Sequence, residues 1–108
     1  MINILEETIM LNINKTIENG TALFALSGRL DTTTAPELEK SLKESLDGVT
    51  SLTLDLKELE YISSAGLRVL LSAHKAMSKK GGMKVVNVNE VVSEVFDVTG
   101  FADILTIE

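Results

Sequence analysis

The sequence has no cysteine, no tryptophan and only one histidine, His74. The lack of cysteine excludes disulfide bonds, thiolate nucleophiles and zinc sites built on thiolates. A single histidine argues against a metal site that depends on imidazole ligands, because such sites use several of them. We therefore expect no metal ion and no cofactor.

Basic residues are the minority, since ten Lys and Arg against sixteen Asp and Glu give a formal net charge of −6. Nucleic acids and anionic membranes are bound through concentrated Lys and Arg, so neither is expected as a partner. No apolar run approaches the roughly 18–20 residues needed to span a bilayer. Residues 1–9 contain Glu6 and Glu7 and lack a basic segment, unlike a signal peptide. We expect a soluble, cytoplasmic protein.

Proline and glycine are also few, one and seven, in a chain of 108 residues of which 44% are hydrophobic. This composition is typical of one small globular domain with its own core. Residues 1–9 have no clear period. We expect them to form an N-terminal extension or a first strand, followed by a domain that spans residues 10–108.

The first part of the domain has the pattern of a β-hairpin. Apolar residues from Ile9 to Ile13 alternate with polar ones, which predicts a half-buried strand. Asn19-Gly20 follows, a strong hairpin signal because both residue types tolerate positive φ. The return strand, residues 21–27, is nearly continuously apolar and is therefore predicted to be a central strand covered on both faces.

A first helix is predicted after the polar turn of residues 28–34. Thr34 and Glu37 have the spacing of a capping box, and leucines at every fourth position up to Leu46 mark the buried stripe. Pro36 conflicts with this start, since proline disfavours helical geometry in the residue before it. Asp47-Gly48 is predicted to end the helix, with Gly48 in a left-handed conformation.

The second half of the chain alternates strands and helices. Strands are predicted at residues 52–56, 83–88 and 104–107, and helices at about 64–79 and between Asn89 and Gly100. Strands joined through helices run parallel, whereas the opening hairpin is antiparallel. The predicted fold class is therefore α/β, with a mixed sheet of four to six strands and three or more helices packed against it.

Two serines, Ser63 and Ser64, stand where the central helix begins. One interpretation is structural: either serine suits the N-cap position, where its oxygen accepts from unpaired backbone N–H groups. The other is functional: one hydroxyl is presented at a helix N-terminus, where the helix dipole tolerates the charge of a phosphate. The local pattern leaves both interpretations open.

Catalysis by this segment is disfavoured. A strand, a serine and a helix in this order are typical of the nucleophile elbow of hydrolases, but Ile62 replaces the leading glycine of that motif. The only candidate base, His74, lies about 15 Å further along the same helix at 1.5 Å per residue. The substrate of a kinase needs only a reachable hydroxyl, because the kinase brings ATP, magnesium and base. We therefore do not expect an enzyme, whereas the role of a kinase substrate needs nothing more than this segment offers.

Five segments together carry a resemblance to a known family. They are Gly28-Arg29-Leu30-Asp31, Leu54-Asp55-Leu56, residues 61–71 (YISSAGLRVLL), Gly81-Gly82 before a Val-rich strand, and residues 96–101 (FDVTGF). They resemble the STAS domains of the anti-anti-sigma factors, also called anti-sigma factor antagonists, across essentially residues 10–108. The third segment is the most specific, because the family has there an aromatic and an aliphatic residue, then Asp-Ser-Ser/Ala-Gly-Leu entering a helix.

The resemblance implies a mechanism. Such a protein, while unphosphorylated, binds an anti-sigma factor that is also a serine kinase of the GHKL-type ATPase class, and so frees a sigma factor for transcription. Phosphorylation of the serine that heads the helix weakens this complex, and a PP2C-type phosphatase resets it. By position in the motif the acceptor is Ser64, with Ser63 as the second choice. We expect a monomer or a weak dimer.

A partner-binding surface beside the acceptor is also implied by the resemblance, with the turn from Asp31 to Thr34 at its border. Helical spacing adds Arg68 and Ser72, which lie on the exposed side of the helix that Ser64 begins, in one polar arc with Lys75 and Lys79. The expected surface residues are Asp31, Thr32, Thr33, Ser63, Ser64, Arg68 and Ser72.

One residue departs from the family pattern, because Ser63 stands where most members have aspartate. This removes a charge next to the acceptor and supplies a competing hydroxyl. It also leaves open a constitutive STAS module that binds a protein or a small ligand, for example in a stress-signalling assembly or a lipid-trafficking complex.

Overall fold

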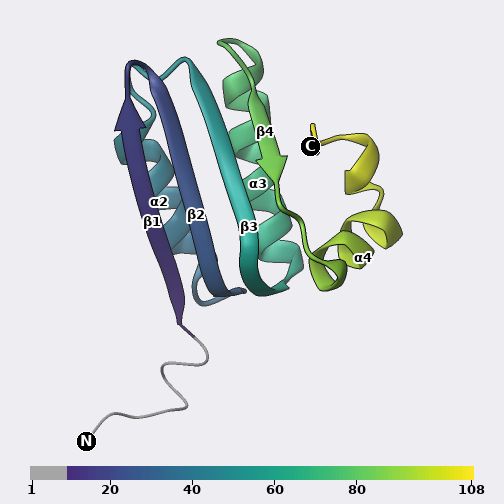
Figure 1. The fold of residues 1–108 in the computed structure, drawn as a ribbon. Coiled ribbons are helices and arrows are strands. Elements are labelled where there is room, and N and C mark those ends of the chain that lie inside the picture. The colour runs from purple at the N-terminus through teal and green to yellow at the C-terminus, as the bar shows by residue number, and fades with distance from the viewer. Residues whose placement is uncertain (1–9) are drawn as a thin grey trace, which may run out of the picture.

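Four strands form one mixed sheet in a computed structural model that describes residues 10–108 (Figure 1). The strands are β1 (Leu11–Glu18), β2 (Thr21–Leu30), β3 (Ser51–Ile62) and β4 (Met83–Val86), in the spatial order β1-β2-β3-β4. β1 and β2 are antiparallel, whereas β2, β3 and β4 are mutually parallel. This confirms the predicted mixed sheet. The expected extension or first strand in residues 1–9 lies outside the described residues.

The turn between β1 and β2 has the predicted geometry. Glu18 pairs with Thr21, so the connection is the two-residue turn Asn19-Gly20. Asn19 has φ 51° and Gly20 has φ 80°, the positive values that such hairpin turns require. The hairpin signal in the sequence is therefore confirmed.

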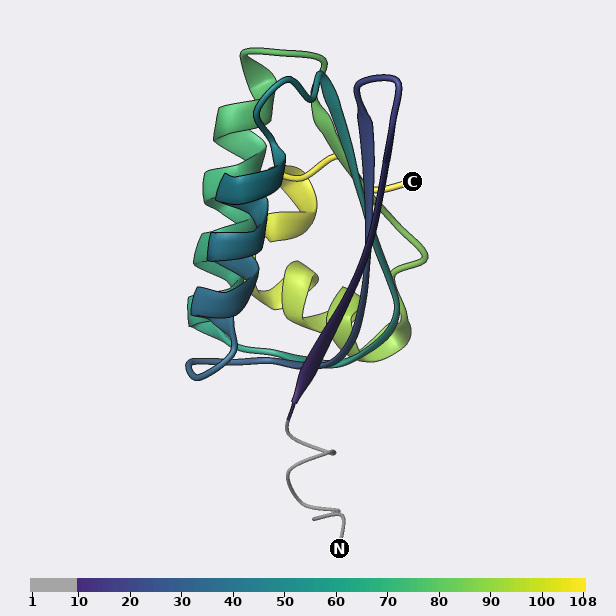
Figure 2. The ribbon, with the colours of Figure 1, turned by 90° about the vertical axis from the view of Figure 1, so that its left-hand side faces the viewer.

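The helices α2 (Ala35–Ser45), α3 (Ser64–Ser78) and α4 (Glu90–Thr99), with the 3₁₀ turn η1 (Phe101–Asp103), all cover the same face of the sheet (Figure 2). The expectation that β2 is covered on both faces was wrong, since Leu23 is 40% exposed beside fully buried Phe24. From β2 through β3 to β4, each strand is added on the same side of the strand before it. Crossovers of one hand then place their helices on one side, and no helix within residues 10–108 covers the other face.

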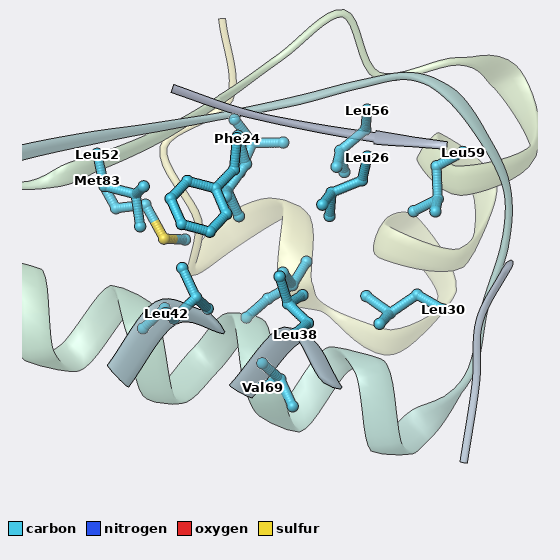
Figure 3. Close-up of a cluster of buried hydrophobic side chains, with 14 of the residues drawn as sticks. Phe24, Leu26, Leu30, Leu38, Leu42, Leu52, Leu56, Leu59, Val69 and Met83 are labelled. Carbon is cyan, nitrogen blue, oxygen red and sulfur yellow. The ribbon is translucent and has the colours of Figure 1, made fainter. Parts of the chain in front are cut away.

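The core lies between the helix layer and the covered face of the sheet. Figure 3 shows Phe24 and Leu26 of the sheet pointing toward Leu38 of α2 and Val69 of α3. These four side chains are buried, and full burial of one such side chain stabilises the fold by about 1.5–3 kcal/mol. The core therefore fixes α2 and α3 against the sheet and against each other.

β3 is longer than predicted, because it continues past Leu56 to Ile62. Its buried side chains follow the two-residue period up to Leu56 and then change to Leu59 and Ile62. The pairing of β2 with β3 shifts register between Ala25 and Ser27, and such a bulge places extra residues on one strand. The bulge breaks the alternation from which the sequence predicted the strand.

The ends of several elements also differ from the predictions. β4 stops at Val86, because Asn87 adopts φ 55°, and the strand expected at residues 104–107 is reduced to a single bridge between Val85 and Ile107. α2 ends at Ser45, ahead of the predicted Asp47-Gly48. The limits of α4 are as predicted. Asn89 caps its start by accepting from Val92 N at 3.0 Å, and Gly100 ends it with φ 82°.

Candidate functional site

The candidate site lies at the edge of the sheet where β2 and β3 end and where α2 and α3 begin (Figure 1). Leu30 pairs with Ile62 at the ends of these two strands. The next residue, Ser63, donates its backbone N–H to the Leu30 carbonyl at 2.9 Å. This pairing brings the turn after β2 beside the first turn of α3.

The turn after β2 is organised by the carboxylate of Asp31. Its Oδ1 accepts from Thr33 N at 3.0 Å, from Thr33 Oγ1 at 2.7 Å and from Thr34 N at 3.1 Å. The predicted capping box of Thr34 and Glu37 was wrong, since Thr34 makes no side-chain cap bond to α2. The Thr34 hydroxyl instead accepts from Asp31 N and donates to the Arg29 carbonyl, each at 2.8 Å. Pro36 is the second residue of α2, where no backbone donor is needed.

These donors stabilise the charged form of Asp31. The Thr33 hydroxyl is the main cause that lowers the pKa of this carboxyl below 3.8, and the backbone N–H groups of Thr34 and Thr33 act in the same direction against the opposing effect of burial. Because the pKa of Asp31 is lower in the folded state, its carboxylate contributes fully to folding stability at pH values above its ordinary pKa of 3.8. This contribution is lost as the pH falls through the lowered pKa of the folded state.

Asp31→Asn is therefore expected to reduce the free energy of unfolding by about 0.5–1.5 kcal/mol at pH 7. The amide keeps an acceptor oxygen but lacks the charge that strengthens the three hydrogen bonds donated by Thr33 N, Thr33 Oγ1 and Thr34 N. Urea unfolding at a series of pH values should show the difference from the wild-type chain shrinking below pH 3.8, as the wild-type carboxyl becomes neutral. A difference that is constant from pH 7 to pH 2 would mean that the charge has no part in holding the turn.

Arg29 joins the ends of the two strands, a role that the sequence analysis did not assign. Its Nε lies 3.7 Å from Asp31 Oδ2, and its guanidinium carbon lies 4.2 Å from the centre of the Tyr61 ring. Arg29 pairs with Tyr61 in the sheet, which places both side chains on one face. The sequence signal was the Arg-x-Asp spacing and the aromatic residue at position 61, but their contact depends on the parallel pairing of β2 with β3.

Ser63 is the N-cap of α3, which decides between the two serines as the capping residue. Its backbone is extended, with φ −100° and ψ 176°, and its Oγ accepts from Gly66 N at 3.4 Å. Its carbonyl accepts from Leu67 N at 2.9 Å, and the side chain is half-buried. The hydroxyl of Ser63 is therefore engaged in starting the helix.

Ser64 is the first residue of α3, and it is exposed. Within residues 10–108, its hydroxyl has no hydrogen-bond partner, and the backbone N–H groups of Ser64 and Ala65 also have none. The first turn of a helix carries a partial positive charge through such unpaired donors. An anion on Ser64 would therefore lie in a favourable field.

Gly66 lets the first turn of α3 approach the sheet closely. A Cβ at this position would lie 2.7 Å from Leu30 Cγ and 3.0 Å from Ile62 Cγ1, closer than side chains pack. Both neighbours are buried and end the two strands that define the site. The glycine therefore sets the position of Ser64 relative to the turn after β2.

Two grooves run between α2 and α3 and contain the remaining expected residues. Arg68 and Thr32 border a groove of about 410 Å³, which we call the Thr32 groove, lined by Thr32, Ala35, Pro36, Glu39, Ala65, Arg68 and Val69. Ser72 borders a second groove of about 210 Å³, lined by Glu39, Leu42, Lys43, Leu46, Val69, Ser72, Ala73 and Ala76. The structure thus brings Arg68 to the Asp31 turn but places Ser72 further from it.

The sequence analysis missed that α3 has a second buried side. Val69 and Ala73 are buried on a side of the helix different from that of Leu67. The signal in the sequence was the series of apolar residues four apart from Ala65 to Met77. It indicates a contact with another helix, but it does not identify α2 as that helix.

The sequence was compared with models of known protein families. Residues 12–108 match the STAS domain. The chain belongs to the STAS domain family. Because the match covers most of the chain, the resemblance predicted from the sequence is confirmed.

Named relatives of this STAS domain are antagonists of anti-sigma factors. The anti-sigma-B factor antagonist of Bacillus subtilis (strain 168) is 34% identical over 83 residues, which are 76% of each chain. An anti-sigma factor antagonist from Mycobacterium paratuberculosis has a similar structure, with a TM-score of 0.81 and 24% identity over 91% of this chain and 85% of that one. The structure of the Bacillus cell fate determinant SpoIIAA in its phosphorylated form is also similar, with a TM-score of 0.69 and 16% identity. That match covers 92% of this chain and 91% of SpoIIAA. The two structures share the fold, which confirms the predicted α/β class.

The family membership agrees with the expectation that this STAS domain is a regulator, since anti-sigma factor antagonists are non-enzymatic. No helix within residues 10–108 is long and apolar enough to cross a membrane. In the same part of the chain, no three His, Cys, Asp or Glu side chains come together as a set of metal ligands.

Proposed function

We propose that this STAS domain is an anti-sigma factor antagonist whose binding is controlled by phosphorylation of Ser64. Unphosphorylated, it binds an anti-sigma factor that is also a serine kinase of the GHKL-type ATPase class, and this releases a sigma factor in the cytoplasm. Phosphate on Ser64 ends the interaction, and a PP2C-type phosphatase restores it. The observation that carries the proposal is an exposed hydroxyl at the first position of α3 that the described part of the fold does not use.

The two serines differ in what their modification would cost. Ser63 is half-buried, and its oxygen holds the first turn of α3 through Gly66 N. A kinase that modified Ser63 would have to remove this cap, and loss of an N-cap costs about 0.5–2 kcal/mol. Ser64 lies one position further on and is exposed, so a kinase reaches it without that cost.

A phosphate on Ser64 is compatible with the fold. Phosphoserine carries about −1.5 to −2 charges at pH 7, and negative charge at a helix N-terminus is stabilising. The N–H groups of Ser64 and Ala65, which have no partner within residues 10–108, are donors at this end of α3. The same charge inside a protein interface is poorly solvated, so the modification acts on the complex and not on the domain.

The proposed docking surface combines the turn after β2 with the exposed side of α3. Asp31, Thr32 and Thr33 form the turn, Ser63 and Ser64 begin the helix, and Arg68 and Ser72 follow along it. Two similarities support the proposal. The Bacillus subtilis relative is named as an anti-sigma-B factor antagonist, and the structural neighbour SpoIIAA is known in a phosphorylated form.

Ser64→Ala is expected to abolish phosphate incorporation, whereas Ser63→Ala leaves it at one phosphate per chain. The physical reason is that, of the two serines, Ser64 has an exposed hydroxyl without a partner among residues 10–108, whereas the Ser63 hydroxyl accepts from Gly66 N. The measurement is mass spectrometry of the intact chain after incubation with its anti-sigma factor kinase and ATP, followed by mapping of the modified peptide. Phosphate on Ser63, or on the Ser64→Ala chain, would contradict the assignment of the acceptor.

A further inference from the structure

We propose that Arg68 is the residue through which phosphate on Ser64 acts. This inference rests on the proposed function. In the unphosphorylated chain, Arg68 offers its guanidinium to a carboxylate of the anti-sigma factor. In the phosphorylated chain, the phosphate on the same helix captures this guanidinium, so that the partner loses it.

The charge pattern of α3 is the first observation. The chain has a net charge of −6, yet α3 contains Arg68 and Lys75 and no Asp or Glu. Ion pairs among residues 10–108 join Arg29 to Asp31, Lys43 to Glu39 and Lys84 to Glu108, and none includes Arg68. Arg68 is therefore an exposed cation, without an ion-pair partner in the described part of the chain, on the helix that begins with the acceptor.

The spacing of the two residues is the second observation. Arg68 follows Ser64 by four positions, so their side chains lie on one side of the helix with Cβ atoms about 5–6 Å apart. An anion that precedes a cation by four residues has the favourable orientation along a helix. The planar guanidinium can also bind two phosphate oxygens at once, unlike a lysine ammonium.

The place of Arg68 is the third observation. It lines the Thr32 groove together with Thr32 and Pro36, beside the turn that Asp31 organises. A partner that covers this turn therefore meets Arg68. The chain thus offers one cation to two alternative anions, the partner's carboxylate and its own phosphate.

The capture is tested by phosphorus NMR of a chain into which phosphoserine is incorporated at position 64 during translation. The second pKa of a phosphoserine lies near 6, and we expect its midpoint to rise by about 0.2–0.4 in Arg68→Ala because the dianion loses its cation. The midpoint in Arg68→Lys is expected to lie between those of the wild-type chain and Arg68→Ala. Lys75→Ala is the matched control, because it lies on the same polar arc but three turns away, and it should leave the midpoint unchanged.

The second measurement is the affinity for the purified anti-sigma factor by calorimetry, with and without phosphoserine at position 64. Arg68→Ala is expected to weaken the unphosphorylated complex by roughly three- to tenfold and to shrink the further effect of phosphate by the same factor. Lys75→Ala should leave the effect of phosphate as in the wild-type chain.

An unchanged midpoint in Arg68→Ala would overturn the inference, as would an effect of phosphate on affinity that is independent of Arg68. Both results are distinct from failure of the proposed function, because the phosphate is installed without the kinase. If the midpoint shifts as expected but the kinase never modifies Ser64, the proposed function fails and the capture by Arg68 stands.

Discussion

Replacing Ser64 with glutamate is expected to weaken the complex with the anti-sigma factor by roughly ten- to a hundredfold, about 1.4–2.7 kcal/mol. The carboxylate stands at the exposed first position of α3, where the proposed interface would remove water from it. The helix N-terminus accepts the same charge in the free chain, so the melting temperature should change by no more than about 3 °C.

Ser64→Gln is the matched control for this experiment, since glutamine has the size of glutamate without its charge. We expect it to keep most of the affinity, and calorimetric titration of both variants separates the effect of charge from that of bulk. Equal binding of the wild-type, glutamine and glutamate chains would favour a constitutive interaction module in place of a switch. A large loss of melting temperature in both variants would instead show that position 64 is structural.

Gly28→Ala is expected to reduce the free energy of unfolding by about 2–5 kcal/mol, the largest effect on stability that we predict. Gly28 has φ +94°, and a Cβ there would lie 2.1 Å from the backbone oxygen of Met10. That oxygen also accepts from Arg29 N at 3.3 Å, so a methyl group would break this bond and separate β1 from β2. The turn that begins at Asp31 would lose its support from the same strand.

Gly82→Ala is the control, because Gly82 has almost the same φ, +95°, and no atom within 4 Å of the added Cβ. Gly82→Ala should reduce the free energy of unfolding by about 1–2 kcal/mol, which is the penalty of the left-handed conformation alone. Urea unfolding of the two variants then isolates the contact with Met10 as their difference. If both variants lose the same stability, the close approach of Met10 to Gly28 does not contribute.

Short sequence signals were sufficient to predict those turns and helix ends that local hydrogen bonds determine. Asn19-Gly20 forms its hairpin turn, Asn89 caps α4, and Gly100 ends that helix. In each case the partner atom lies within about four residues, so the sequence carries the whole interaction. Thr34 is the exception, because Asp31 and the Arg29 carbonyl take its hydroxyl in place of the helix.

Pairings between distant segments could not be predicted in the same way. The bulge between β2 and β3 changes the period of buried residues after Leu56, and the cover of only one sheet face leaves Leu23 exposed. The contact of Arg29 with Tyr61 and the grooves between α2 and α3 depend on which strands and helices become neighbours. Such neighbours are chosen by the burial of apolar faces across the whole domain, which no short pattern records.

The sequence by itself determined the α/β class, the family and the serine pair at the head of the central helix. Only the tertiary structure decided that Ser64 is the exposed serine, because Ser63 is held by Gly66 N and by the end of β2. It also placed Arg68 beside the Asp31 turn. The physical reason is that periodicity and capping are local, whereas the exposure of a hydroxyl depends on every segment that packs around it.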